Sequence, residues 1–214
     1  MNSPIDAVVA LHNAFRQDIK LIDQAALDSA RGKPGLEATI ERFRFFNEVL
    51  EWHATGEDSV ISPLLESVAP DVYEAYEQDH RALDRAFAEL NRAVSVRDPL
   101  ETARATKAFK FHLDLHLDKE DAHLYRIIRE RVAPPEQGEA VGRMAAHAPQ
   151  ERFPEVVAWM FPLIGHEDRV NMTRSWQMGM PPEGFAMAAS LIERTVGSDW
   201  PALARDIPEL VAVG

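Results

Sequence analysis

Residues 111–123 read FHLDLHLDKEDAH and combine three histidines with four acidic residues. At 100° per residue on a helix, His112, His116, Glu120 and His123 fall on one stripe. Solvent-exposed helix faces are usually built from Lys, Glu and Arg. This density of histidine therefore indicates a helix that binds a ligand.

The composition narrows the kinds of protein that this chain could be. Its 214 residues suit one domain with an elaboration and can bury a sizeable core, so folding need not depend on a metal. The formal net charge of −12 argues against a nucleic-acid partner. The absence of cysteine excludes disulfides, thiolate nucleophiles and Cys-ligated metals. The chain does not start like a signal peptide and no apolar run could span a bilayer, so we expect a cytoplasmic protein without membrane contact.

Four long stretches carry helical periodicity and are separated by short breaker clusters. We expect helices over residues 4–31, 36–68, 71–94 and 99–133, with breaks at RGKPG (31–35), APD (69–71) and VRDP (96–99). Short loops between long helices imply antiparallel neighbours. The predicted fold is therefore all-α, with residues 1–133 forming an antiparallel up-down four-helix bundle. Residues 134–214 are predicted to form a helical C-terminal extension packed on the bundle, and its Met and Trp residues could also serve a homodimer or another partner.

Six polar residues on the four long helices are predicted to share one layer. In an antiparallel pair, residues equally far from the turn lie at equal height, and His12 and His53 lie 21 and 20 residues from a turn centred near Lys33. The same comparison around the turns near residues 69 and 97 brings the other positions to matching heights, within a few ångströms. The complete set is His12, His53, Glu57, His80, His116 and Glu120.

Four imidazoles and two carboxylates suit two metal ions, because carboxylates can bridge ions while histidines complete the coordination. Nitrogen and oxygen ligands without thiolate favour iron, with manganese or zinc as alternatives. Each His-x-x-x-Glu pair places its imidazole and carboxylate one turn apart on the same face. A ferritin-like site would instead need a carboxylate where His12 stands, and it would use His123, which lies too far along the last helix.

The chain resembles the hemerythrin HHE cation-binding family in the order of its motifs. The four helices carry, in turn, a histidine, a His-x-x-x-Glu pair, a histidine and a second His-x-x-x-Glu pair. The resemblance covers roughly residues 5–132. It implies a non-heme di-iron site bridged by Glu57 and Glu120 and by an oxo or hydroxo ligand. The implied histidine pairs are His12 with His53 for one iron and His80 with His116 for the other.

The chain departs from the oxygen carriers of that family, which have a second histidine one turn from the third-helix ligand and end with His-x-x-x-x-Asp. Here Tyr76 and Asp84 stand at the one-turn positions, and the last motif is His-x-x-x-Glu. One fewer histidine leaves a coordination position open. We therefore expect a small ligand such as dioxygen, peroxide or nitric oxide, with catalase- or peroxidase-like turnover left open. The alternative is a non-enzymatic iron or oxygen sensor or storage module that signals through its extension, and a third is an unmetallated bundle.

Three further residues have more than one interpretation. His112 is either a fifth histidine ligand or a surface residue bonded to aspartate or water, and the surface role is favoured. Tyr76 is a ligand, a neighbour of a ligand or a packing residue, and packing is favoured. Gly56 costs about 1 kcal/mol relative to Ala inside a helix, which suggests that another backbone or a small ligand comes close to it.

Overall fold

The computed structural model describes residues 3–212, with only the backbone described over residues 75–80. Within that part of the chain every regular element is a helix, which confirms the predicted all-α class. None of the described helices is both long enough and apolar enough to cross a membrane.

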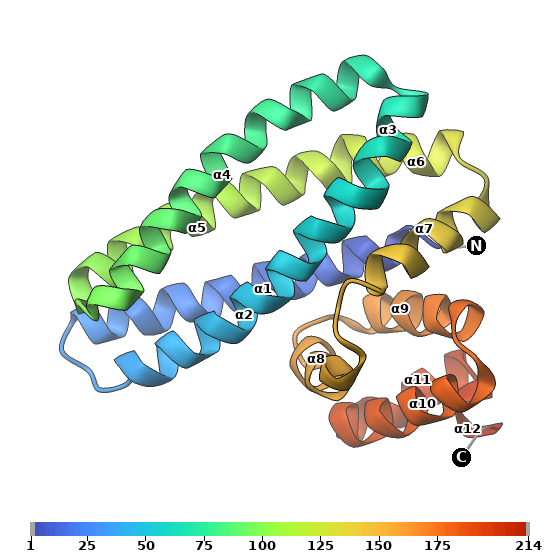
Figure 1. Ribbon diagram of the computed structural model, residues 1–214. Helices are drawn as coiled ribbons and strands as arrows, with labels where there is room; N and C mark the ends of the chain where they lie inside the picture. The colour runs from blue at the N-terminus through green and yellow to red at the C-terminus, as the bar shows by residue number, and fades with distance from the viewer. Residues whose placement is uncertain (1–2, 213–214) are drawn as a thin grey trace.

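Four antiparallel helical rods form the bundle (Figure 1). The first rod is α1 (Asp6–Ala30) and the third is α4 (Pro70–Val96). The second and fourth rods each contain three segments: α2 (Leu36–Gly56), η1 (Glu57–Ile61) and α3 (Ser62–Val68), then α5 (Pro99–Lys119), η2 (Glu120–Leu124) and α6 (Tyr125–Arg131). α1 packs against α2 and α5, and α4 packs against α3 and α5. The predicted bundle is confirmed, and the predicted helix ends agree to within a few residues.

The breaker clusters act as their residue types predict. After α1, Gly32 and Gly35 adopt φ values of +85° and +130°, which a side chain would strain. Before α5, the Asp98 side chain accepts a hydrogen bond from the backbone N–H of Glu101 at 2.8 Å, and Pro99 occupies the first helical position. These local signals set where the rods turn and therefore which residues share a height.

Two separate apolar clusters fill the bundle and leave a polar layer between them. One is centred on Phe15, Phe46 and Phe109, whose ring centroids lie 5.4 Å (Phe15–Phe46) and 6.3 Å (Phe46–Phe109) apart. The other gathers apolar residues of α3, α6 and the start of α1. Along α1, Val8 belongs to the second cluster and Phe15 to the first, and His12 lies between them. The predicted layer is thus set within a hydrophobic interior.

The chain after α6 folds into shorter helices. They are α7 (Pro134–Ala145), η3 (Gln150–Arg152), α8 (Phe153–Met160), α9 (His166–Gly179), α10 (Pro182–Val196), η4 (Gly197–Asp199), α11 (Trp200–Asp206) and α12 (Glu209–Ala212). α7 packs on α2 and η1, and α9 packs on α1. α8 to α12 lie on the side of α1 and α2 that faces away from α4 (Figure 1).

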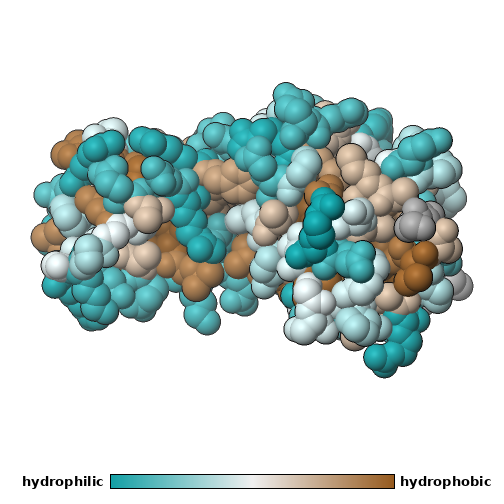
Figure 2. Space-filling view, turned by 90° about the horizontal axis from the view of Figure 1, so that it is seen from below, coloured by the Kyte–Doolittle hydropathy of each residue, from teal (hydrophilic) through white to brown (hydrophobic). Residues whose placement is uncertain are grey.

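The extension packs on a surface of small residues of α1. Ala7, Ala10 and Ala14 belong to one apolar cluster with the buried residues of α8 to α12. Their methyl groups allow α9 to approach α1 closely. On the face seen from below, apolar side chains form several patches among hydrophilic ones (Figure 2). Met178 and Met187 of the extension are exposed.

Candidate metal centre

Three of the rods bring four predicted ligands into one buried cluster. His12 comes from α1, His53 from the end of α2, Glu57 from the start of η1 and Glu120 from the start of η2. One ligand atom of each residue lies within 4.8 Å of those of the other three. The two imidazoles face each other, with 3.0 Å between their Nε2 atoms. The set has the composition and spacing of a metal site.

The predicted second ion would use His116 and His80. Glu120 has a histidine near each oxygen: His12 Nε2 lies 3.7 Å from Oε2, and His116 Nε2 lies 3.2 Å from Oε1. That arrangement suits a carboxylate that bridges two ions. The side chains of His80 and Tyr76 lie outside the described residues, so their predicted roles stay predictions.

Each glutamate begins a π-helical segment, which the sequence did not indicate. η1 starts at Glu57 and η2 starts at Glu120. Short π segments inside α-helices are rare and are frequent at functional sites. Tyr125 lies five residues after Glu120, and in an α-helix two such side chains would point about 140° apart. The wider π-helical turn of η2 instead brings Tyr125 to the same side as Glu120, at the cluster. The Tyr125 hydroxyl donates a hydrogen bond to Glu57 Oε1, and its ring centroid lies 5.4 Å from that of His12.

The pKa values of the two facing histidines are shifted in opposite directions. His12 Nδ1 lies 2.8 Å from Asp121 Oδ1, so this nitrogen carries hydrogen and donates to the carboxylate. Burial lowers the pKa of His12, but the hydrogen bond to Asp121 and the nearby Glu57 and Glu120 carboxylates outweigh it and raise the pKa to about 9. Burial lowers the pKa of His53 to about 4, because the opposing effect of Glu57 is smaller. The two Nε2 atoms, 3.0 Å apart, are thus held by groups whose pKa values are shifted in opposite directions.

The two glutamates are also held in different states. Burial raises the pKa of Glu57, but His53 and His12 outweigh it and hold that pKa well below its usual range. Burial and the charge of Glu57 together raise the pKa of Glu120 well above its usual range. Glu120 Oε2 is buried and has no hydrogen-bond partner among the described residues. Such an oxygen is costly to bury, and a cation between the glutamates would remove the cost, so these residues fit a metal ion.

The model of the hemerythrin HHE cation-binding domain matches residues 3–128. The chain belongs to this family. The match extends from the start of the bundle into α6 and confirms the resemblance seen in the sequence. It establishes a cation-binding domain.

Two proteins of Arabidopsis thaliana are similar to this hemerythrin-family chain. Zinc finger protein BRUTUS is 26% identical over 188 residues, and zinc finger protein BRUTUS-like At1g74770 is 22% identical over 185 residues. The matches cover 85% and 80% of this chain but 15% of each relative, so the chain spans only that share of their length. This sequence has no cysteine and therefore carries no Cys-ligated zinc finger. No solved structure matches the chain.

Sequence reasoning missed Asp121, although its position held a signal. Asp121 lies five residues after His116, at the spacing of the aspartate in the family's oxygen carriers, so the stretch HLDKED contains both spacings. The structure directs Glu120 into the hemerythrin cluster and Asp121 to His12 Nδ1. Burial raises the pKa of Asp121, but His12 and Arg16 outweigh it and lower that pKa. Asp121 therefore acts as a partner of His12, a predicted ligand.

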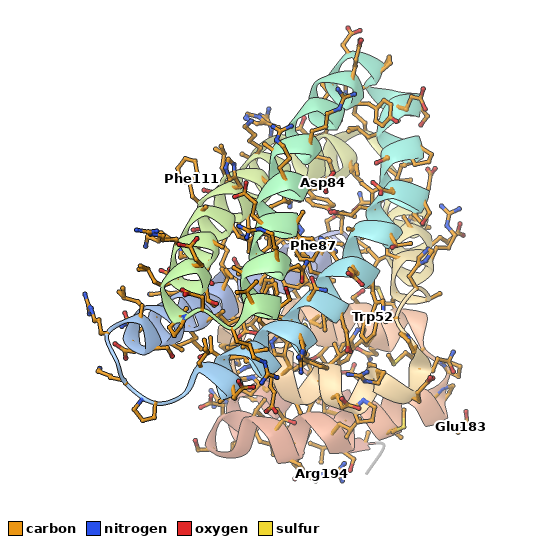
Figure 3. All side chains as sticks on the ribbon, turned by 60° about the vertical axis from the view of Figure 1, so that its left-hand side comes forward. Trp52, Asp84, Phe87, Phe111, Glu183 and Arg194 are labelled. Carbon is orange, nitrogen blue, oxygen red and sulfur yellow. The ribbon has the colours of Figure 1, made fainter. Side chains whose placement is uncertain are left out.

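The remaining candidates lie at the edge of the site. His112 on α5 is half-buried, and its ring centroid lies 5.4 Å from that of Phe111. Phe111 is exposed and points away from the bundle (Figure 3). His123 is exposed, as expected if the ferritin-like arrangement does not apply. A Cβ on Gly56 would lie 3.2 Å from the Cα of Met144, so the close approach at this glycine is made by the backbone of α7.

A cavity of about 340 Å³ reaches the two glutamates of the hemerythrin site. Its described lining is Glu57, Asp58, Ile61, Ser62, Leu65, Tyr73, Arg81, Asp84, Glu120 and Leu124. Asp84 lies on α4 and is labelled in Figure 3. The cavity has room for a small molecule directly beside the carboxylates.

Proposed function

We propose that this hemerythrin domain holds two iron ions through His12, His53, Glu57, His80, His116 and Glu120. The observation that carries the proposal is the position of Glu120. It lies between His12 and His116, and its Oε2 has no hydrogen-bond partner within the described part of the chain. A donor set of imidazole and carboxylate without thiolate supports iron.

Iron held there would supply a redox-active centre that accepts dioxygen, peroxide or nitric oxide at an open coordination position. The cavity beside Glu57 and Glu120 supports access of a small ligand to that centre. Tyr125 holds Glu57 through its hydroxyl, and Asp121 fixes the orientation of the His12 ring. Hydrogen bonds of this kind orient ligands and tune a metal site. We propose peroxide turnover of the catalase or peroxidase type as the first activity to test.

Reconstitution with ferrous iron under anaerobic conditions tests this proposal. We expect two iron ions per chain by elemental analysis, and loss of hydrogen peroxide in the same sample. His53→Ala should lose both properties, because it removes a buried nitrogen of the cluster. His123→Ala, which removes an exposed histidine of the neighbouring stretch, should keep both. A wild-type chain that stays metal-free, or a His53→Ala variant that binds as much iron, would refute the proposal.

A second candidate function is a non-enzymatic sensor or storage module that uses the same site. It is favoured by the contact of α9 with the helix that carries His12, including a hydrogen bond from Asn13 to Asp168 of 3.0 Å. In that case iron removal should change the rate at which proteases cleave residues 134–214, while peroxide is not consumed. An unchanged cleavage pattern would argue against this candidate.

A further inference from the structure

A line of side-chain hydrogen bonds connects His12 with α9 of the C-terminal extension. Asp121 accepts from His12 Nδ1 at 2.8 Å, and its other oxygen accepts from Arg16 Nη2 at 2.7 Å. Arg16 Nη1 donates to Asn13 Oδ1 at 3.2 Å. Asn13 Nδ2 then donates to Asp168 Oδ2 at 3.0 Å. Of these five residues, Asp168 alone lies outside residues 3–128, which match the family.

The direction of each bond along this line follows from the chemistry of its groups. Arginine can only donate and an ionised carboxylate can only accept. The amide of Asn13 is therefore oriented from both ends, with its oxygen toward Arg16 and its nitrogen toward Asp168. Without the Asp168 carboxylate the amide could rotate, and Arg16 Nη1 would lose a fixed acceptor.

Arg16 also has a competing partner. Its Nη2 lies 3.0 Å from Asp118 Oδ1, and the Asp118 side chain is 71% exposed. An Arg16 side chain that is no longer held by Asn13 can move toward Asp118 and solvent. Asp121 would then lose part of the interaction that keeps it against the His12 ring.

We propose that Asp168 is a positioning residue of the metal centre. Through Asn13 and Arg16 it holds Asp121 against His12 Nδ1, and this keeps His12 Nε2 directed into the cluster. The extension thus contributes to metal binding although the proposed ligands all lie in the bundle. This inference rests on the proposed function, since it concerns the retention of iron at the same site.

The test compares the release of ferrous iron to a chelator from full-length variants loaded without oxygen. Loss of a hydrogen-bonding partner of a ligand typically costs about 10–100-fold in metal affinity. Because Asp168 acts through two further residues, we expect Asp168→Ala to speed release by about 3–10-fold, below the effect of Asp121→Asn. Asp168→Asn should restore most of the wild-type rate, because its carbonyl oxygen can still accept from Asn13. Glu167→Ala is the matched control, since it removes an exposed carboxylate from the same first turn of α9.

A double variant separates positioning from a general loss of stability. Asn13→Ala should speed release as Asp168→Ala does, and the two together should do no more than either alone, because they break one line. Melting temperatures of the metal-free variants should stay close to the wild type. The inference is overturned if Asp168→Ala releases iron at the wild-type rate, if Glu167→Ala has the same effect, or if the two changes add. A wild-type chain that takes up no iron would instead refute the proposed function itself.

Discussion

Replacing Glu120 by glutamine should stabilise the metal-free chain while it abolishes metal binding. Glu120 is 1% exposed, its Oε2 has no hydrogen-bond partner among the described residues, and the charge of Glu57 is nearby. A buried acceptor without a partner costs about 1–3 kcal/mol, and glutamine keeps the shape without the charge. We therefore expect the free energy of unfolding to rise by about 1–3 kcal/mol, with roughly 2–4 °C in melting temperature for each kcal/mol at this chain length.

Glu57→Gln is the matched control because it should have the opposite sign. Glu57 accepts from Tyr125 and lies beside His12 and His53, which lower its pKa, so the loss of its charge should destabilise the fold. Thermal unfolding followed by circular dichroism, on chelator-treated protein, gives both values.

The pH dependence provides a second check on Glu120. Its raised pKa means that the wild-type chain loses stability as pH rises above the ordinary glutamate value of 4.5. The advantage of Glu120→Gln should therefore be large at pH 8 and small at pH 5. If the variant melts below the wild type at pH 8, or if its advantage is equal at both pH values, the description of this carboxylate is wrong.

Two other features give independent predictions. Gly56→Ala should destabilise the chain, because the new Cβ would lie 3.2 Å from the Cα of Met144. This overpacking should outweigh the higher helix propensity of alanine and lower the free energy of unfolding, measured in urea titrations, by about 1 kcal/mol. Gly142→Ala in α7 meets nothing within 4 Å and should raise it by about 0.5–1 kcal/mol. His12, with a pKa of about 9, must lose a proton when a metal binds, so iron affinity should increase from pH 7 to pH 9. Titration calorimetry in two buffers of different ionisation enthalpy counts the protons released, and a count of zero would contradict this state of His12.

Much of the bundle could be predicted because its signals are local. Glycine and proline breakers mark the turns, and a constant rise per residue converts distance from a turn into height. That reasoning placed His12 and His53 together, and the structure brings their Nε2 atoms to 3.0 Å. The same layer includes Glu57 and Glu120 in the structure.

Other features depend on contacts that no local pattern contains. The π-helical segments that begin at Glu57 and Glu120 have no signal in the sequence that we could read, and the one after Glu120 brings Tyr125 back to the site. The docking of α7 at Gly56 and of α9 at Asn13 joins segments far apart in the chain. The sequence suggested a close approach at Gly56 and could not say which backbone makes it.

Anomalous diffraction at the iron edge, from crystals of the iron-loaded chain, tests the proposed di-iron site most directly. We expect two peaks, one on each side of the Glu120 carboxylate. One peak should lie within bonding distance of the Nε2 atoms of His12 and His53, and the other within bonding distance of His116 and His80. A single peak, or peaks away from Glu120, would show that this carboxylate does not bridge two iron ions.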